Sequence, residues 1–384
     1  MDRFGGPVAY ADDEQRVHIV QTGVPASALT AIDSTVTSDA ASWSGSWWLS
    51  KPAAGWQVTV RDKASGATVR TLAGSAARGL LTAAWDGKDT AGRLVANGTY
   101  TWTLSAKPAD GQGAALTLSG TTRVTAGSAA PRDYAGADGV GDVLTLSADG
   151  TLTVQRGTGT GTLGAKVTGA GWPTTAKFVP YGDLSGDRCD DVLVRMGDGT
   201  LRAYRPACGK AATPSTPYVS LGTGWNQYDV LTSPGDVDGD RRPDLVARQA
   251  STGDVYLFKG TSAGKLSART RIGARWTGYK TLVGAGDLNG DGRGDLVAQD
   301  RSNTLWRFDG TGTGAFKARV KIAANWGASY NSVVGVGDFT GDGRADLVSR
   351  DTTGALWRTN GNGKGVFGAR TRIATGWQGY KAVV

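Results

Sequence analysis

Histidine is almost absent from this chain of 384 residues, which contains His18 and no other. A Ser–His–Asp triad would have to use that residue, and zinc peptidases need more than one histidine. His18 lies in the strand-like segment RVHIV with no nucleophile motif near it, so its role is expected to be structural. Carboxylate pairs of the glycosidase type remain open, but the conspicuous aspartates have another explanation, given below. The sequence therefore predicts a protein that is not an enzyme.

Cysteine is also scarce, and the two copies, Cys189 and Cys208, lie close together in the sequence. A disulfide between them would close a loop of about twenty residues, worth roughly 3 kcal/mol if the bond acts on chain entropy. Such a bond is typical of secreted proteins. The alternative is a pair of buried free thiols. We favour the disulfide, which leaves no thiol for catalysis.

Long hydrophobic runs are missing, because no stretch reaches the 18 or more apolar residues of a membrane span. The start, MDRFGGPVAY, lacks the basic and apolar regions of a secretory signal, and we expect it to lie inside a longer parent chain. The net charge of +8 comes from scattered Lys and Arg. Without a basic block or stripe, this pattern argues against nucleic-acid binding.

Runs of strong helix formers are scarce too, whereas glycine, with 59 copies, is abundant. This composition indicates many short strands joined by tight turns. Residues 41–128 alternate apolar and polar positions between Gly, Asn and Asp turns, which predicts a small antiparallel β-sandwich. Residues 1–40 are interpreted as the tail of an upstream module followed by a linker.

Residues 129–384 contain a repeat of about fifty residues. The stretch GDLNGDGRGDLVAQD from Gly286 has close relatives that start at Gly182, Gly235 and Gly337. A fifth, degraded copy, RDYAGADGVGDVLTLS, starts at Arg132. A tryptophan recurs in step with these copies, at Trp172, Trp225, Trp276, Trp326 and Trp377.

Each repeat has the pattern of four short strands, as in YDVLTS, DLVARQ, DVYLFKG and ARTRIG. Four antiparallel strands per repeat are typical of a propeller blade; a solenoid, the alternative, would need capping repeats. The segment YKAVV after Trp377 matches the strand that the first copy lacks. We therefore expect it to complete the first blade of a five-bladed β-propeller, although strands from residues 1–40 could enlarge the ring. The overall prediction is an all-β chain, with an Ig-like sandwich before the propeller.

The acidic loops place oxygen-bearing side chains at their first, third, fifth and ninth positions. Ca²⁺ prefers several oxygen ligands in irregular geometry, and a glycine at the fourth position lets the loop curl. The predicted calcium ligands are Asp183, Ser185, Asp187 and Asp191; Asp236, Asp238, Asp240 and Asp244; Asp287, Asn289, Asp291 and Asp295; and Asp338, Thr340, Asp342 and Asp346.

The alternative is that these aspartates only cap backbone amides in polar turns. Clustered carboxylates would then repel one another without compensation, so we favour calcium. The degraded copy, with Asp133, Asp138 and Asp142, lacks the second polar position and is expected to be an empty or weak site.

The periodic tryptophans follow basic segments such as ARTRIGARW and ARVKIAANW. Rings beside Arg suit the stacking of sugars and the binding of hydroxyls or anions, so Trp172, Trp225, Trp276, Trp326 and Trp377 are candidate ligand-binding residues. The alternative is that they pack between blades. Tyr256, Trp306 and Trp357 on the third strands are open to the same two interpretations.

Two resemblances follow from these motifs. The Gly-Asp…Gly-Asp…Asp-Leu-Val elements resemble FG-GAP/VCBS repeats, a family of β-propellers in which calcium is structural and which often form larger rings. WDGKDTAGRLVANGTYTWTL, from Trp85, resembles the Ig-like domain of flagellar hook-capping proteins, which implies a spacer or docking module.

The combined expectation is a secreted bacterial binding module, stabilised by calcium and lectin-like toward a cell-surface or cell-wall glycan. The alternative is a protein-interaction scaffold or adaptor within a secreted assembly, or accessory domains of a larger exported enzyme.

Overall fold

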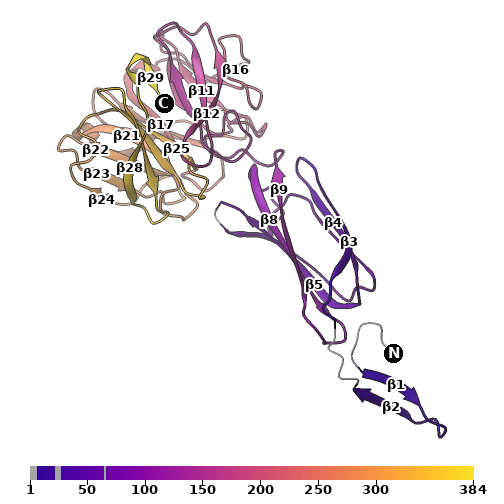
Figure 1. Cartoon of the computed structure of the whole chain (residues 1–384). Coiled ribbons are helices and arrows are strands. Elements are labelled where there is room, and N and C mark those ends of the chain that lie inside the picture. The colour runs from indigo at the N-terminus through magenta and orange to yellow at the C-terminus, as the bar shows by residue number, and fades with distance from the viewer. Residues whose placement is uncertain (1–6, 22–26, 65) are drawn as a thin grey trace. The chain divides into compact units, whose positions relative to one another are not determined.

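The computed structural model describes residues 7–21, 27–64 and 66–384, which divide into two compact units at Gly127 and Ser128. The chain is built from strands, with three short 3₁₀ turns (Figure 1). In the first unit, β1 (Pro7–Ala11) and β2 (Val17–Gln21) pair only with each other. No helix in the described part of the chain is long and apolar enough to cross a membrane.

The remainder of the first unit is an Ig-like sandwich of two antiparallel sheets. One sheet has the order β3 (Ala31–Ser38), β4 (Trp43–Leu49), β7 (Leu80–Trp85). The other has the order β6 (Thr68–Gly74), β5 (Ala53–Asp62), β8 (Gly98–Pro108), β9 (Leu116–Val124). The sandwich therefore begins earlier than residue 41, because β3 lies in the segment predicted to be linker and pairs with β4.

Three tryptophans form the centre of the sandwich core. Trp43, Trp47 and Trp102 are buried, with ring centroids 5.1 to 6.0 Å apart. Strand β8 alternates buried and exposed side chains, because one face meets this core and the other meets solvent. The alternation seen in the sequence has this packing as its cause.

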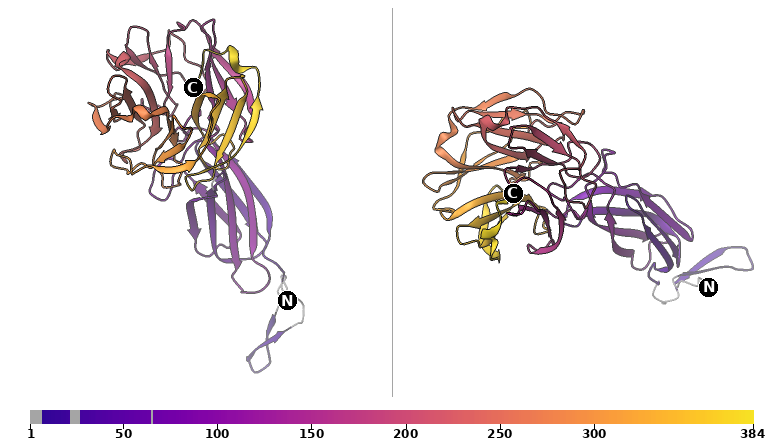
Figure 2. Two further views of the ribbon diagram at one scale, coloured as in Figure 1. Left: turned by 90° about the vertical axis from the view of Figure 1, so that its left-hand side faces the viewer. Right: turned by 90° about the horizontal axis from the view of Figure 1, so that it is seen from above.

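The second unit is a five-bladed β-propeller of four-stranded antiparallel blades, seen from further sides in Figure 2. Blade 1 contains β12 (Leu163–Gly169), β11 (Leu152–Gly157), β10 (Val143–Leu146) and β29 (Ala382–Val383), and blade 2 contains β13 (Lys177–Pro180), β14 (Val192–Arg195), β15 (Leu201–Tyr204) and β16 (Tyr218–Ser220). Blade 3 contains β17 (Tyr228–Gly235), β18 (Asp244–Gln249), β19 (Val255–Phe258) and β20 (Thr270–Gly273). Blade 4 contains β21 (Tyr279–Gly286), β22 (Asp295–Asp300), β23 (Leu305–Phe308) and β24 (Val320–Ala323), and blade 5 contains β25 (Tyr330–Gly337), β26 (Asp346–Asp351), β27 (Leu356–Gly361) and β28 (Phe367–Ala374).

The four strands predicted for each repeat are confirmed, and so is the completion of blade 1 by the last strand. Within β29 and β10, Val383 pairs with Thr145 and Ala382 with Leu146. No described strand before residue 128 joins a propeller sheet. The ring therefore has five blades.

Apolar clusters between consecutive blades hold the ring together. In β14, Val192 and Val194 pack in the cluster shared with blade 1, whereas Leu193 packs in the cluster shared with blade 3. Val143 of blade 1 and Val348 of blade 5 share another cluster. Both faces of the second strands are therefore covered, which explains why the Asp-Leu-Val segments are continuously apolar rather than alternating.

Glycines allow the innermost strands to approach closely at the centre of the ring. A Cβ added to Gly284 would lie 2.0 Å from the Ser233 carbonyl oxygen, and one added to Gly335 would lie 2.2 Å from the Gly284 carbonyl oxygen. Any side chain at these positions would force the blades apart.

Candidate metal and ligand sites

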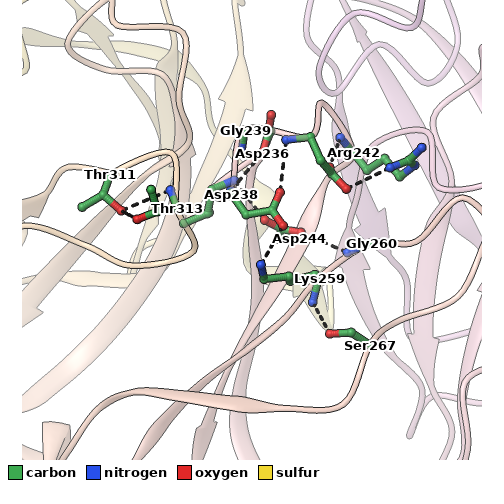
Figure 3. A network of polar contacts seen from close by, with 12 residues as sticks. Asp236, Asp238, Gly239, Arg242, Asp244, Lys259, Gly260, Ser267, Thr311 and Thr313 are labelled. Atoms are coloured by element: carbon green, nitrogen blue, oxygen red, sulfur yellow. Dashed lines mark hydrogen bonds and ion pairs between the residues drawn. The ribbon is translucent and has the colours of Figure 1, made fainter.

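Each acidic loop connects the innermost strand of a blade to the second strand. In blade 3, Oδ1 of Asp236 accepts the backbone N–H groups of Asp238 (3.1 Å) and Gly239 (2.7 Å), and Oδ2 accepts that of Arg241 (2.7 Å). Gly239 has φ of 88°, the left-handed region that the predicted curl requires. The loop backbone is thus wrapped around its first carboxylate (Figure 3).

The last aspartate of each loop is buried at the start of the second strand. Asp244 is 0% exposed and accepts N–H groups from Val237 and Gly260, both at 3.0 Å. Burial raises the pKa of Asp191 and Asp244 to about 7, and that of Asp295 and Asp346 to about 6. The ionised form is disfavoured at these positions, and a nearby divalent cation would favour it.

Blade 3 brings three predicted ligands together. Carboxylate oxygens of Asp236, Asp238 and Asp244 lie within 4.8 Å of one another (Figure 3). Lys259 Nζ lies 3.0 Å from Asp238 Oδ2, and its positive charge partly balances the cluster. The fourth predicted ligand, Asp240, instead faces Arg242.

The other three loops are looser, because their described aspartates do not gather within that distance. Their third-position side chains bond inside the loop: Ser185 to Asp183, Asn289 to Asp291, and Thr340 to Asp346. The capping hydrogen bonds expected of polar turns are also present, for example from Gly290 and Gly341. The donor set is all oxygen and suits a hard cation, and capping uses lone pairs without using all of them.

Blade 2 departs from the pattern at Asp191. In blades 1, 3, 4 and 5 the last aspartate accepts an N–H from a glycine. The corresponding residue in blade 2 is Pro206, which has no N–H, and Asp191 Oδ1 is buried with no hydrogen-bond partner among the described residues.

In the degraded loop of blade 1, an arginine from the same blade balances the negative charge of an aspartate. Asp133 accepts N–H groups of Gly136, Asp138 and Gly139, as the first aspartates of the other loops do. Arg156 Nη2 lies 2.9 Å from Asp138 Oδ2. The Arg156 guanidinium therefore balances the negative charge of Asp138, which a bound cation would balance in a metal-binding loop.

The periodic tryptophans lie in the clusters between blades. Trp172, Trp225 and Trp377 are buried, and Trp276 and Trp326 are half-buried against their clusters. Packing between blades thus accounts for all five tryptophans. Of these, only the rings of Trp276 and Trp326 are partly exposed to solvent. A role in ligand binding stays a prediction for this series.

Comparison with known proteins matches parts of the chain to two protein families. Residues 236–298 and 287–349 match the FG-GAP-like repeat, and residues 33–110 match the FlgD Ig-like domain. The chain carries FG-GAP-like repeats and a FlgD Ig-like domain. No curated protein matches it.

Several solved structures are similar to parts of the chain. FlgD from P. aeruginosa has 25% identity over 25% of this chain and 71% of its own, with a TM-score of 0.19. The BP39L lectin from Burkholderia pseudomallei has 12% identity over 90% of this chain and 100% of its own, with a TM-score of 0.38. AofleA from Arthrobotrys oligospora has 12% identity over 72% and 83%, with a TM-score of 0.36. None of these similarities is close enough to transfer an activity.

The propeller contains a buried arginine clamp that the sequence analysis did not predict. Arg195 Nη1 donates to the carbonyl oxygens of Trp225 (3.1 Å) and Tyr228 (2.6 Å), which flank the 3₁₀ turn leading into blade 3. Arg248, Arg350 and Gln299 hold the corresponding turns. The signal was the recurrence of Arg four residues after the last loop aspartate, visible in DVLVR, DLVAR and DLVSR.

In blades 3, 4 and 5, an arginine in or just before the fourth strand stacks on an aromatic ring of the third strand. The guanidinium carbons of Arg269, Arg319 and Arg370 lie 4.5, 4.0 and 4.2 Å from the ring centroids of Tyr256, Trp306 and Trp357, respectively. The three arginines are exposed and the rings are half-buried. We call these pairs the outer stacks.

Each outer stack is fixed by further hydrogen bonds. Arg319 Nη1 donates to the Tyr279 hydroxyl at 2.7 Å, and Trp306 Nε1 donates to Asp300 Oδ2 at 2.9 Å. Equivalent bonds join Arg269 to Tyr228 and Arg370 to Tyr330. The outer stacks thus present planar cations in a preorganised position at the same place on three blades.

Proposed function

We propose that the protein is a secreted, non-catalytic, calcium-stabilised module that binds a repetitive cell-surface or cell-wall glycan. The outer stacks are the observation that carries this proposal. A guanidinium held flat on a ring offers N–H donors to sugar hydroxyls and acidic substituents. Three such sites in register would bind a repeating polymer with avidity.

Secretion and calcium are part of the same proposal. The disulfide between Cys189 and Cys208 suits an oxidising compartment. Calcium would be bound by the acidic loops, with blade 3 the best-formed site because Asp236, Asp238 and Asp244 converge there. Its chemistry would be structural, namely charge compensation for buried carboxylates.

Polysaccharide pull-down and a glycan array test the binding proposal. The variant Arg269→Gln/Arg319→Gln/Arg370→Gln should lose saturable binding by at least about tenfold, because each site loses a charge-assisted donor. The control Lys265→Gln/Lys317→Gln/Lys364→Gln removes three exposed cations from the same blades and should bind as the wild type does. No saturable binding by the wild type, or equal binding by both variants, would contradict the proposal.

Thermal melting tests calcium separately. Added Ca²⁺ should raise the melting temperature and a chelator should reverse the rise, because a ligand that binds only the folded state stabilises it. An unchanged melting temperature would rule out the structural-metal part.

A scaffold function is a second candidate, favoured by an apolar surface on the sandwich. Trp48 (51% exposed) pairs with Leu80 (44% exposed) across β4 and β7. Exposed neighbouring apolar side chains are typical of protein-binding surfaces. Capture of a protein partner that requires Trp48 and is insensitive to sugars would select this function.

A further inference from the structure

The propeller contains a cavity of about 340 Å³ among its innermost strands. All five blades contribute to its lining, through β13, β17, β21, β25 and β29. Apolar side chains such as Val230, Leu282 and Val333 form much of the wall. The volume is near the lower end of small-molecule sites, which run from about 300 to 1,000 Å³.

Positive charge predominates in this cavity. Arg132, Lys177, Arg195 and Lys280 line it, against one carboxylate side chain, Asp229, and the C-terminal residue Val384, which carries the chain's terminal carboxylate. The Asp229 carboxylate is already engaged, since Arg248 Nε and Nη2 donate to its two oxygens at 3.0 and 2.7 Å. Arg132 is partly balanced as well, because it interacts electrostatically with the buried Asp190. Lys177, Arg195 and Lys280 form no ion pair with any described residue, although Lys280 Nζ donates to Asn303 Oδ1 at 2.5 Å.

Comparison of the three blades that have a clamp arginine shows that, among the described residues, only the arginine of blade 2 has no side-chain acceptor at Nε. In blade 3 the clamp arginine pairs with Asp229, and in blade 5 Arg350 Nε donates to Asn331 Oδ1 at 2.9 Å. In blade 2, Lys177 lies directly opposite Arg195 in the β13–β14 register, whereas Val230 and Ser332 lie opposite Arg248 and Arg350 in blades 3 and 5. Two cations directly opposite each other in a sheet are destabilising.

An anion in the cavity would remove this conflict. Arg195 is 8% exposed, so its charge is poorly solvated, and only its Nη1 is used by the clamp. Its Nε donates to no side chain among the described residues, whereas Nε of the clamp arginines in blades 3 and 5 donates to Asp229 and Asn331. Lys177 and Lys280 are exposed and lie on the same lining.

We propose that the central cavity is a binding site for the acidic group of a compact organic anion, held between Lys177, Arg195 and Lys280. The acidic group is a carboxylate or a phosphate ester, and the apolar wall accommodates a body of about monosaccharide size. The site is separate from the outer stacks, so it does not depend on glycan binding there.

Calorimetry and thermal melting test this site with four probes at constant ionic strength. Glucuronate and glucose 6-phosphate distinguish a carboxylate from a phosphate ester, glucose is the neutral control, and chloride is the background anion. The wild type should bind at least one of the two acids saturably and melt at a higher temperature with it, and glucose should have no effect.

Substitutions at Lys177 separate binding from folding. Lys177→Gln should weaken acid binding by at least about tenfold, because one charge-assisted contact is lost. Lys177→Asp should place a carboxylate directly opposite Arg195, raise the melting temperature without ligand, and abolish the response to acid. Lys265→Gln, an exposed lysine outside the cavity, should behave as the wild type does.

The proposal is overturned if neither acid binds the wild type, if glucose binds as well as the acids, or if Lys177→Asp retains full acid binding. The outcome is independent of the pull-down experiment, because Lys177→Gln leaves every outer stack intact.

Discussion

At the scale of single residues, aspartate serves three purposes in this propeller. Asp236 organises a loop backbone, Asp244 anchors the loop to a buried strand, and Asp351 fixes a turn and a tryptophan. Their pKa values differ accordingly. Burial raises the pKa of Asp244 to about 7, whereas hydrogen bonds from Thr353 and then Trp357 lower the pKa of Asp351 to about 2.

Asp351 predicts a pH-dependent contribution to stability. Its pKa is lower in the folded state than the ordinary 3.8, so its contribution is complete above about pH 4 and is lost as pH falls toward 2. Asp351→Asn should reduce the free energy of unfolding at pH 7 by about 2 kcal/mol, and the difference from the wild type should shrink below pH 3. Urea denaturation at both pH values measures this. A difference that stays constant with pH would contradict it.

Blades 2 and 3 predict unequal effects of the same substitution. Asp244→Asn keeps one oxygen for one of the two N–H donors, Val237 and Gly260, but turns an amide N–H₂ group toward the other donor, which should cost about 1–3 kcal/mol. Asp191→Asn should cost less, because Asp191 Oδ1 has no donor to lose. Urea denaturation with a chelator present compares the two variants without metal. Equal losses would show that Pro206 does not matter.

At the scale of elements, the second strand of a blade secures the entrance to the next. The arginine clamp reaches from β14 to the turn before β17, and from β26 to the turn before β29. Blade 4 achieves the same contact with Gln299, so the clamp requires a hydrogen-bond donor and no positive charge.

The clamp predicts a graded series at Arg350. Arg350→Ala leaves the carbonyl oxygens of Trp377 and Tyr380 without this donor and should lower the free energy of unfolding by about 2–3 kcal/mol. Arg350→Gln imitates blade 4 and should cost less than about 1 kcal/mol. Chemical denaturation of both variants tests the series, and equal losses would assign the effect to charge instead.

Strand assignment was possible from the sequence at this scale, because four copies of one pattern support each other. DLVARQ is β18 and YDVLTS begins β17. The arginine clamp was not predicted, since its partners lie about thirty residues further along the chain and on another blade. The beginning of the sandwich at β3 was also missed, because that strand is almost entirely exposed and has no apolar pattern.

At the scale of the whole molecule, two residues in β29 close the propeller. Val383 pairs with β10 of blade 1 and packs in the cluster that blades 1 and 5 share. Closure gives the innermost strand of every blade a place in a four-stranded sheet. It also completes the cavity that carries the proposed anion site.

Ring closure predicts a strong effect of a small deletion. Removal of residues 380–384 should abolish cooperative unfolding or lower the melting temperature far more than any point substitution above, because blade 1 loses its inner strand. Moving residues 376–384 to a position just before Arg132, as in the other blades, should restore most of the loss. Differential scanning calorimetry checks both chains, and normal melting of the deleted chain would refute the role of β29.

The sequence by itself determined the repeat, the strands within it and the oxygen-rich loops, because these depend on residue type and short spacing; it only favoured the disulfide, which the structure contains. Tertiary structure alone decided that the periodic tryptophans lie between blades, that Asp191 lacks a partner, and that Lys177 faces Arg195 beside a cavity. These outcomes depend on contacts between blades and on register, and neither is encoded in the spacing of one repeat. The physical reason is that a propeller buries both faces of each blade only after all five have met.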